Sequence, residues 1–124
     1  AYCFTSVPGF SSFGNYVGNG DSDGAFINTG FKPAFVMIKN TDLSAENWII
    51  HDNKRRTYNA NNTFLYPNLD AVEVVNDSYP IDFLSNGFKC KNNNDQWNGD
   101  GHPYIYMAWG QTCVGSNNVP ATAK

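Results

Sequence analysis

The sequence carries little charge. Eight Lys and Arg face eleven Asp and Glu, which gives a net charge of −3, and charged residues make up 15% of the 124 residues. An average globular domain has about 25%. The longest basic run is Lys54-Arg55-Arg56. A nucleic-acid-binding protein needs a dense basic patch, so we expect no nucleic-acid partner.

Long apolar runs are missing as well. No stretch approaches the roughly 20 consecutive apolar residues that a membrane-spanning helix needs. We therefore expect a soluble chain with no membrane partner.

Cysteine is scarce and irregularly spaced. Cys3, Cys90 and Cys113 show none of the close pairs typical of zinc sites. An odd number of cysteines cannot all pair within one chain. Two interpretations remain open, namely free buried thiols or a bridge between Cys3 and Cys113.

Aromatic residues and asparagine are abundant. Phe, Tyr and Trp make up 15% of the chain, and there are 18 Asn, more than all the carboxylates together. Disordered chains have few aromatics, and long charged helices are built from Ala, Glu, Lys, Leu and Arg. The composition is instead typical of a β-rich extracellular or virion surface protein.

Gly and Asn recur at short intervals and divide the chain into short apolar runs, because both residues suit reversals of the backbone. In the last run, Tyr104, Tyr106 and Ala108 alternate with Ile105, Met107 and Trp109, so both faces are apolar, as expected of a central strand inside a sandwich. The runs that predict strands are residues 1–7, 16–17 with their neighbours, 25–29, 34–39, 47–52 and 104–110.

Two further short strands, 81–84 and 88–90, flank the pair Asn86-Gly87, which is a strong hairpin signal. Helix signals are weak, and only residues 70–75 could form one or two turns. Short strands separated by turns predict an all-β protein, an antiparallel β-sandwich of jelly-roll-like type with little or no helix. We expect a single domain over residues 1–124, with 111–124 as a polar C-terminal tail or arm.

A calcium site is one hypothesis for the segment that starts at Asn19. Oxygen-bearing side chains at Asn19, Asp21 and Asp23, followed by Gly24, match the opening of a calcium loop. The closing position holds Gly30 instead of Glu. A looser calcium site formed by Asp21, Asp23 and a distant carboxylate and a plain turn without a metal both remain open.

Acid–base catalysis has weak candidates. His51-Asp52 and the segment Asp100-Gly101-His102 are the only close pairs of histidine and carboxylate. In a strand, His51 and Asp52 would point to opposite faces. We therefore interpret the histidines as structural or solvated and expect no enzyme.

Contacts to a glycan or to a protein partner are the alternative. Aromatic faces stack on sugar rings while amides bind hydroxyl groups, and Trp97 is the aromatic residue most expected to be exposed, with a cap over the end of the core as its other interpretation. The basic cluster at 54–56 could bind an anionic glycan or form a solvated turn held by an Arg ion pair. The candidate contact residues are Trp97, Asn93, Asn94, Asn98, His102, Arg55, Arg56 and Tyr58.

Several segments together carry a family resemblance that covers almost the whole chain. They begin in residues 10–39, with Gly18-Asn19-Gly20, Asp23-Gly24 and Thr29-Gly30-Phe31-Lys32-Pro33-Ala34-Phe35-Val36-Met37-Ile38-Lys39, and continue with Asn47-Trp48, Asp52, Arg55 or Arg56, Tyr58-Asn59, Leu65-Tyr66-Pro67-Asn68, Ile81-Asp82-Phe83-Leu84-Ser85-Asn86-Gly87-Phe88-Lys89, Tyr104-Ile105-Tyr106-Met107-Ala108 and residues 114–124. These segments resemble a domain of tail proteins from tailed bacteriophages and marine viruses, most specifically at 81–89.

This resemblance implies a noncatalytic module of a tail fibre or other appendage at the virion surface. We expect attachment to host-surface glycan, with other copies of the chain, as a trimer, and other virion proteins as partners. The alternative is a purely structural virion subunit, used in capsid decoration or fibre formation, that touches no receptor. No cofactor is implied beyond the calcium hypothesis.

Overall fold

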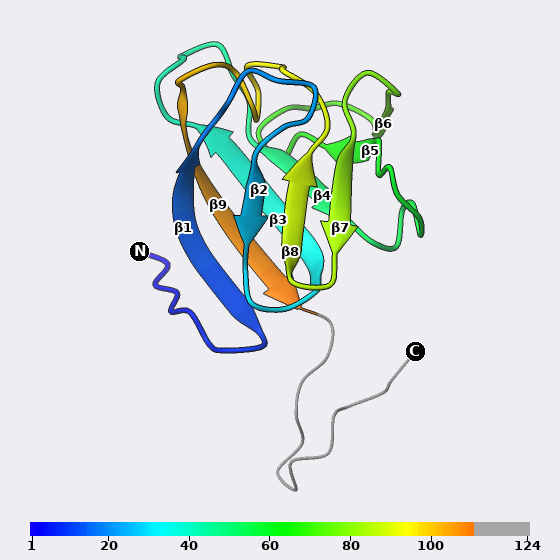
Figure 1. Ribbon diagram of the computed structural model, residues 1–124. Helices are drawn as coiled ribbons and strands as arrows, with labels where there is room; N and C mark the ends of the chain where they lie inside the picture. The colour runs from blue at the N-terminus through cyan, green and yellow to red at the C-terminus, as the bar shows by residue number, and fades with distance from the viewer. Residues whose placement is uncertain (111–124) are drawn as a thin grey trace, which may run out of the picture.

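The computed structural model describes residues 1–110, which form nine β-strands and no helix (Figure 1). No membrane-crossing helix therefore exists in this range. The predicted tail at 111–124 lies outside the described residues. The strands are β1 (Ser11–Val17), β2 (Phe26–Asn28), β3 (Pro33–Asn40), β4 (Ile49–Asp52), β5 (Thr63–Leu65), β6 (Val74–Val75), β7 (Ile81–Leu84), β8 (Gly87–Cys90) and β9 (Pro103–Gly110).

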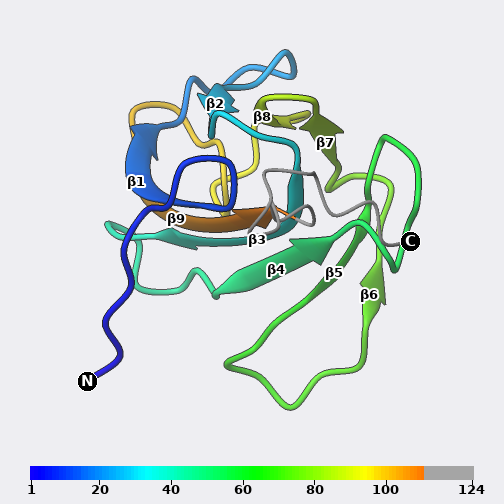
Figure 2. The ribbon, with the colours of Figure 1, turned by 90° about the horizontal axis from the view of Figure 1, so that it is seen from below.

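The strands form two antiparallel sheets. The larger has the order β1-β9-β3-β4-β5-β6 and the smaller the order β2-β8-β7. Figure 2 shows β2, β8 and β7 together on one side of β9, β3 and β4. The protein is thus all-β, with a sandwich-like packing of two unequal sheets, and the predicted fold class is confirmed.

The core lies between the sheets because apolar residues alternate along their strands. In β3, Val36 and Ile38 are fully buried, and in β9 so are Tyr104 and Ala108. Ile81 in β7 faces them from the smaller sheet and is fully buried too. The buried face of β9 is thus the predicted Tyr-Tyr-Ala face, whereas its Ile-Met-Trp face lies on the outer side of the larger sheet.

Trp97 completes the core from the loop between β8 and β9, which corrects the prediction that it is exposed. Its side chain is 0% exposed, and its ring packs edge-on against Tyr79 and Phe64. The indole nitrogen donates a hydrogen bond to Asn92 Oδ1 at 2.8 Å. The interpretation as a cap over the core is the one that the structure bears out.

The predicted first strand, residues 1–7, is wrong. This segment is exposed, and its one bridge within residues 1–110 joins Val7 to Ser11 across a turn that contains Gly9 at φ +76°. The turn reverses the chain, so the first strand to find a partner in the sheet is β1.

The possible helical turns at 70–75 are wrong as well. Val74 and Val75 form β6, which pairs with β5, a strand that sequence reasoning missed. Valine is a weak helix former and fits a pleated strand.

The hairpin of β7 and β8 is confirmed, with its turn one residue earlier than expected, at Ser85-Asn86. Gly87 is instead the first residue of β8. A side chain there would collide with the carbonyl oxygen of Ile27 in β2. The glycine thus permits close strand approach.

The cysteines follow neither interpretation fully. Cys90 is a free buried thiol, and burial raises its pKa to about 12. Cys3 is exposed, which corrects the expectation of a buried thiol there. Cys113 lies outside the described residues, so the Cys3–Cys113 bridge stays a prediction.

Candidate functional site

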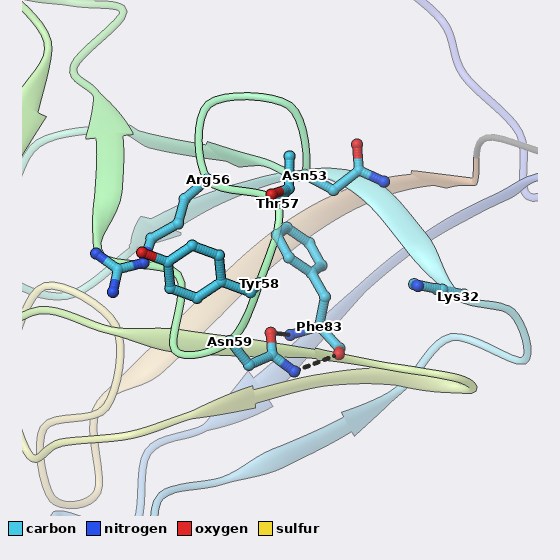
Figure 3. A pocket seen from close by; sticks show the side chains of 7 residues that line it. All are labelled: Lys32, Asn53, Arg56, Thr57, Tyr58, Asn59 and Phe83. Carbon is cyan, nitrogen blue, oxygen red and sulfur yellow. Dashed lines mark hydrogen bonds between the residues drawn. The ribbon is translucent and has the colours of Figure 1, made fainter. Parts of the chain in front are cut away.

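A polar pocket of about 180 Å³ lies where the loop at 53–60, which follows β4, meets β7. Figure 3 shows its side chains around the ring of Phe83, with Arg56 and Lys32 on opposite sides of that ring. The lining residues are Lys32, Asn53, Arg56, Thr57, Tyr58, Asn59 and Phe83.

Asp52, the last residue of β4, organises the start of the loop. Its Oδ1 accepts hydrogen bonds from the backbone N–H groups of Lys54 and Arg55, each at 2.8 Å. Its Oδ2 lies 2.7 Å from Nε of Arg55, which also pairs with Glu73. The predicted turn anchored by an Arg ion pair is therefore present, and Arg55 is the residue that anchors it.

Asn59 fastens the middle of the loop to β7. Its Nδ2 donates to the carbonyl oxygen of Phe83 at 2.8 Å, and its Oδ1 accepts from the N–H of Phe83 at 2.9 Å (Figure 3). The Asn59 amide thus makes the pair of hydrogen bonds with the backbone of Phe83 that a residue of a neighbouring strand would make. This fixes one wall of the pocket on a rigid element.

Arg56 and Tyr58 form the other wall. The guanidinium carbon of Arg56 lies 4.5 Å from the centre of the Tyr58 ring, a cation–π arrangement. Arg56 Nη1 donates to Asn62 Oδ1 at 2.5 Å, while its buried Nε has no partner in the part of the chain described. Tyr58 is 65% exposed, so much of its ring is open to solvent.

The charge of the pocket is positive. Lys32 and Arg56 contribute cations, and among residues 1–110 no carboxylate and no histidine lines the pocket. Amides of Asn53 and Asn59 complete the polar lining. Such a set of groups suits an uncharged or anionic ligand with hydroxyl groups and one apolar face.

The structure does not bring the other predicted contact residues to this pocket. Trp97 and Asn98 are fully buried, so neither side chain is open to a sugar. Asn93 is exposed, whereas Asn94 accepts a hydrogen bond from the N–H of Gln96 at 2.9 Å. His102 lies elsewhere, with Nδ1 2.8 Å from Asp42 Oδ2.

Asn98 connects two loops instead of contacting a ligand. Its Oδ1 accepts from the N–H groups of Asn19 and Ala25, at 3.2 and 3.3 Å. Its Nδ2 donates to Asn19 Oδ1 and to the carbonyl oxygens of Asp21 and Asn92 at 2.8 to 3.0 Å. The asparagine-rich loop 92–101 is therefore held firmly against loop 18–25.

His51 and Asp52 point to opposite faces of β4, as predicted. His51 is fully buried, and burial lowers the pKa of its imidazole to about 4. Its Nδ1 lies 3.4 Å from Asn61 Oδ1. This histidine belongs to the core and stays neutral near pH 7, in agreement with the structural interpretation.

The calcium candidates are engaged in other contacts. Asp21 Oδ1 accepts from the N–H of Asp23 at 2.9 Å, as in an ordinary Asx turn. Asp23 Oδ1 lies 2.5 Å from Lys89 Nζ, whose hydrogen bond and charge lower the pKa of Asp23. Among residues 1–110, no cluster of three or more His, Cys, Asp or Glu is placed to hold a metal ion.

Sequence reasoning missed Lys32, Asn53, Asn59 and Phe83 as parts of one site. Asn59 lies in a cluster that predicts a turn, and Lys32 lies in a segment of the family resemblance. No local pattern indicates that these residues meet, because packing of the loop on β7 brings them together.

The chain belongs to a protein family described as a domain of unknown function (DUF7483), whose model matches residues 1–112. No curated protein and no solved structure is similar enough to the chain to count as a match.

Proposed function

We propose that this chain, as a member of that family, is a noncatalytic module of a virion surface that attaches to host-surface glycan through the pocket beside β7. The observation that carries the proposal is the open ring of Tyr58, backed by Arg56, in a pocket that the described part of the chain lines without any carboxylate. An exposed aromatic face is the surface on which the CH groups of a sugar stack.

The charge of the pocket favours an acidic sugar. Lys32 and Arg56 supply positive charge on either side of Phe83, and a guanidinium pairs well with a carboxylate. The Asn59 amide binds both backbone groups of Phe83 and keeps one N–H and one lone pair for a hydroxyl group. The ligand class is therefore a polysaccharide with carboxylate-bearing units.

The placement at a virion surface rests on the resemblance to tail proteins, whose most specific segment is 81–89. A tail fibre or appendage presents several copies of a module. Several shallow pockets on one particle can together bind far more tightly than one pocket alone. A pocket of about 180 Å³ is suited to such use.

The test compares binding of the full chain to an acidic bacterial polysaccharide with binding to a neutral one. Binding is measured by calorimetry or by retention on immobilised polysaccharide. We expect retention on the acidic polysaccharide. Tyr58→Ala should weaken binding about tenfold, as expected for loss of roughly 1–1.5 kcal/mol of stacking. Lys32→Gln should weaken it several-fold and reduce its dependence on salt.

Lys54→Gln is the matched control, because it removes the same charge from an exposed lysine that belongs to the loop at 53–60 but does not line the pocket. It should change binding by less than a factor of about two at physiological salt. Equal losses for Lys32→Gln and Lys54→Gln would show that only net charge matters. No binding to host cells or host polysaccharide would sink the attachment proposal.

A purely structural virion subunit is the second candidate. The outer face of the larger sheet favours it, because the half-buried Met37, Met107 and Trp109 lie there without a covering sheet in the described part of the chain. A chain that assembles with virion proteins but ignores every host glycan would support this candidate.

A further inference from the structure

An apolar row crosses the outer face of the larger sheet. The pairing registers join Phe13 in β1 to Met107 in β9, Met107 to Met37 in β3, Met37 to Ile50 in β4, and Ile50 to Leu65 in β5. All five residues are half-buried. The alternate positions of these strands fill the core, so the row lies on the side away from the smaller sheet.

The surroundings of the row extend the apolar surface. Trp109 and Phe35 lie on one side of it, and Ile105 lies on the other. Phe4 from the N-terminal segment stacks on Phe13 and meets Trp109 edge-on, but Phe4 itself is 60% exposed. Ile105 is exposed like Phe4, whereas the other residues of this surface are half-buried. Contiguous apolar area that is open to solvent in part marks a site of protein association.

Opposite charges stand at the two sides of the row. Lys39 pairs in register with Ile105 on one side, and Asp52 pairs with Phe35 on the other. Asp52 shares Arg55 with Glu73, so that group of three carries one net negative charge. Lys39 donates to the carbonyl oxygen of Asn40 and has no carboxylate partner within residues 1–110.

We infer that this face binds the same face of a second copy of the chain, with a two-fold axis along the apolar row. Such an axis places row on row and exchanges the two sides, so Lys39 of each copy lies over the Asp52 side of the other. The apolar rows of the two copies then contact each other. Lys39 of each copy faces the side on which Asp52, Arg55 and Glu73 of the other copy lie. A face that is complementary to itself makes a closed pair, packed like two sheets of a sandwich at about 10 Å.

The pair differs from the trimer expected from the resemblance. A ring of three needs two different patches on each copy, whereas one self-complementary face satisfies two copies completely. The inference does not depend on the proposed glycan pocket, since none of the residues of the row lines that pocket.

The test is the mass of the full chain in solution, measured by light scattering over a range of concentrations. We expect twice the 13.8 kDa of one chain. Met37→Glu, which places two carboxylates at the centre of the pair, should give the mass of a single chain. Lys39→Glu should weaken the pair at low salt more than at high salt.

Phe26→Glu is the matched control, because Phe26 is 46% exposed and lies in β2 of the smaller sheet, away from the row. It should leave the pair intact. Near-UV circular dichroism checks that Met37→Glu keeps its fold, and Ile105→Glu, at an outward position of β9, serves if it does not. A single chain at all concentrations, a trimer, or a pair that tolerates both Met37→Glu and Ile105→Glu would overturn the inference.

Discussion

At the scale of single residues, His51 is a buried polar group with an incomplete set of partners. Its ring lies between Phe64 and Trp97, with centroids 5.5 and 5.9 Å away. Nδ1 faces Asn61, while Nε2 has no hydrogen-bond partner among residues 1–110. The core therefore accepts the neutral imidazole and disfavours the charged one.

This burial predicts that stability decreases in mild acid. The pKa of a histidine is about 6.5 in an unfolded chain, and that of folded His51 is about 4. Between these values the unfolded chain binds a proton that the folded chain does not. Stability is thus complete above about pH 6.5 and falls as the pH drops toward 4, by roughly 3 kcal/mol in total. Urea unfolding at several pH values in this window measures the slope.

His51→Gln is the control for this slope, because an amide can still reach Asn61 and has no proton to gain. We expect the variant to be less stable at neutral pH, and we expect its unfolding free energy to depend less on pH between 6.5 and 4. The pKa of Asp23 is lowered from 3.8. The stability that its ionised carboxylate contributes is therefore lost only at pH values below the window in which His51 acts. An equal slope in both proteins would assign the effect to other groups.

The burial of Trp97 could not be predicted from the residues that surround it in the sequence. Its neighbours from 92 to 101 are mostly polar, and a tryptophan among them looks exposed. The side chain is buried because the loop folds back over the end of the sandwich, where Asn92 accepts the indole N–H. Burial here depends on the path of the loop, which local composition does not specify.

At the scale of elements, Asn98 determines how two loops lie together. Asn98→Asp would keep the oxygen that accepts from Asn19 and Ala25 but would place a second oxygen against three acceptors. A buried carboxylate oxygen that faces acceptors and has no donor is costly. We expect the variant to lose about 2–4 kcal/mol of unfolding free energy, measured by urea unfolding.

The control for this prediction is Asn93→Asp. It makes the same chemical change at an exposed position of the same loop, and we expect a loss below about 0.5 kcal/mol. Comparable stability of the two variants would mean that the contacts of Asn98 do not hold the loops together.

The elements differ in how well the sequence predicts them. Residues of β3, β9 and the β7–β8 hairpin show clear alternation or a clear turn, and their strands are found where expected. β5 and β6 have three and two residues, too few for an alternating pattern. They exist because Val74 and Val75 find a partner in β5, a contact between separate segments.

At the scale of the whole molecule, the fold class follows from many short strands, whereas the pocket does not follow from any one segment. Lys32 comes from the connection of β2 and β3, Arg56 and Tyr58 from the loop after β4, and Phe83 from β7. The basic cluster predicts Arg56 and Tyr58 alone. The other five lining residues are not predicted, and tertiary packing is what brings Lys32 and Phe83 to the loop, so most of the site does not follow from local sequence.

The thermal stability of the whole chain tests the calcium hypothesis. Asn19 Oδ1 accepts from Asp21 N–H and Asn98 Nδ2, Asp21 Oδ1 accepts from Asp23 N–H, and Asp23 pairs with Lys89. A calcium ion would have to displace these donors and the lysine. We therefore expect the same melting temperature, within about 1 °C, in chelator and in millimolar calcium.

If calcium binds to the folded chain and not to the unfolded chain, the melting temperature should rise. An ion present at 100 times its dissociation constant stabilises by about 2.7 kcal/mol, which in a domain of this size raises the melting temperature by several degrees. Magnesium controls for the general effect of a divalent cation. Asp23→Asn tests whether a rise in melting temperature comes from calcium at this loop, because the variant should abolish such a rise. Without bound calcium, the variant loses only the partly exposed ion pair with Lys89, which is worth about 1 kcal/mol or less. A rise with calcium alone that Asp23→Asn removes would show that the metal displaces Lys89 from this loop.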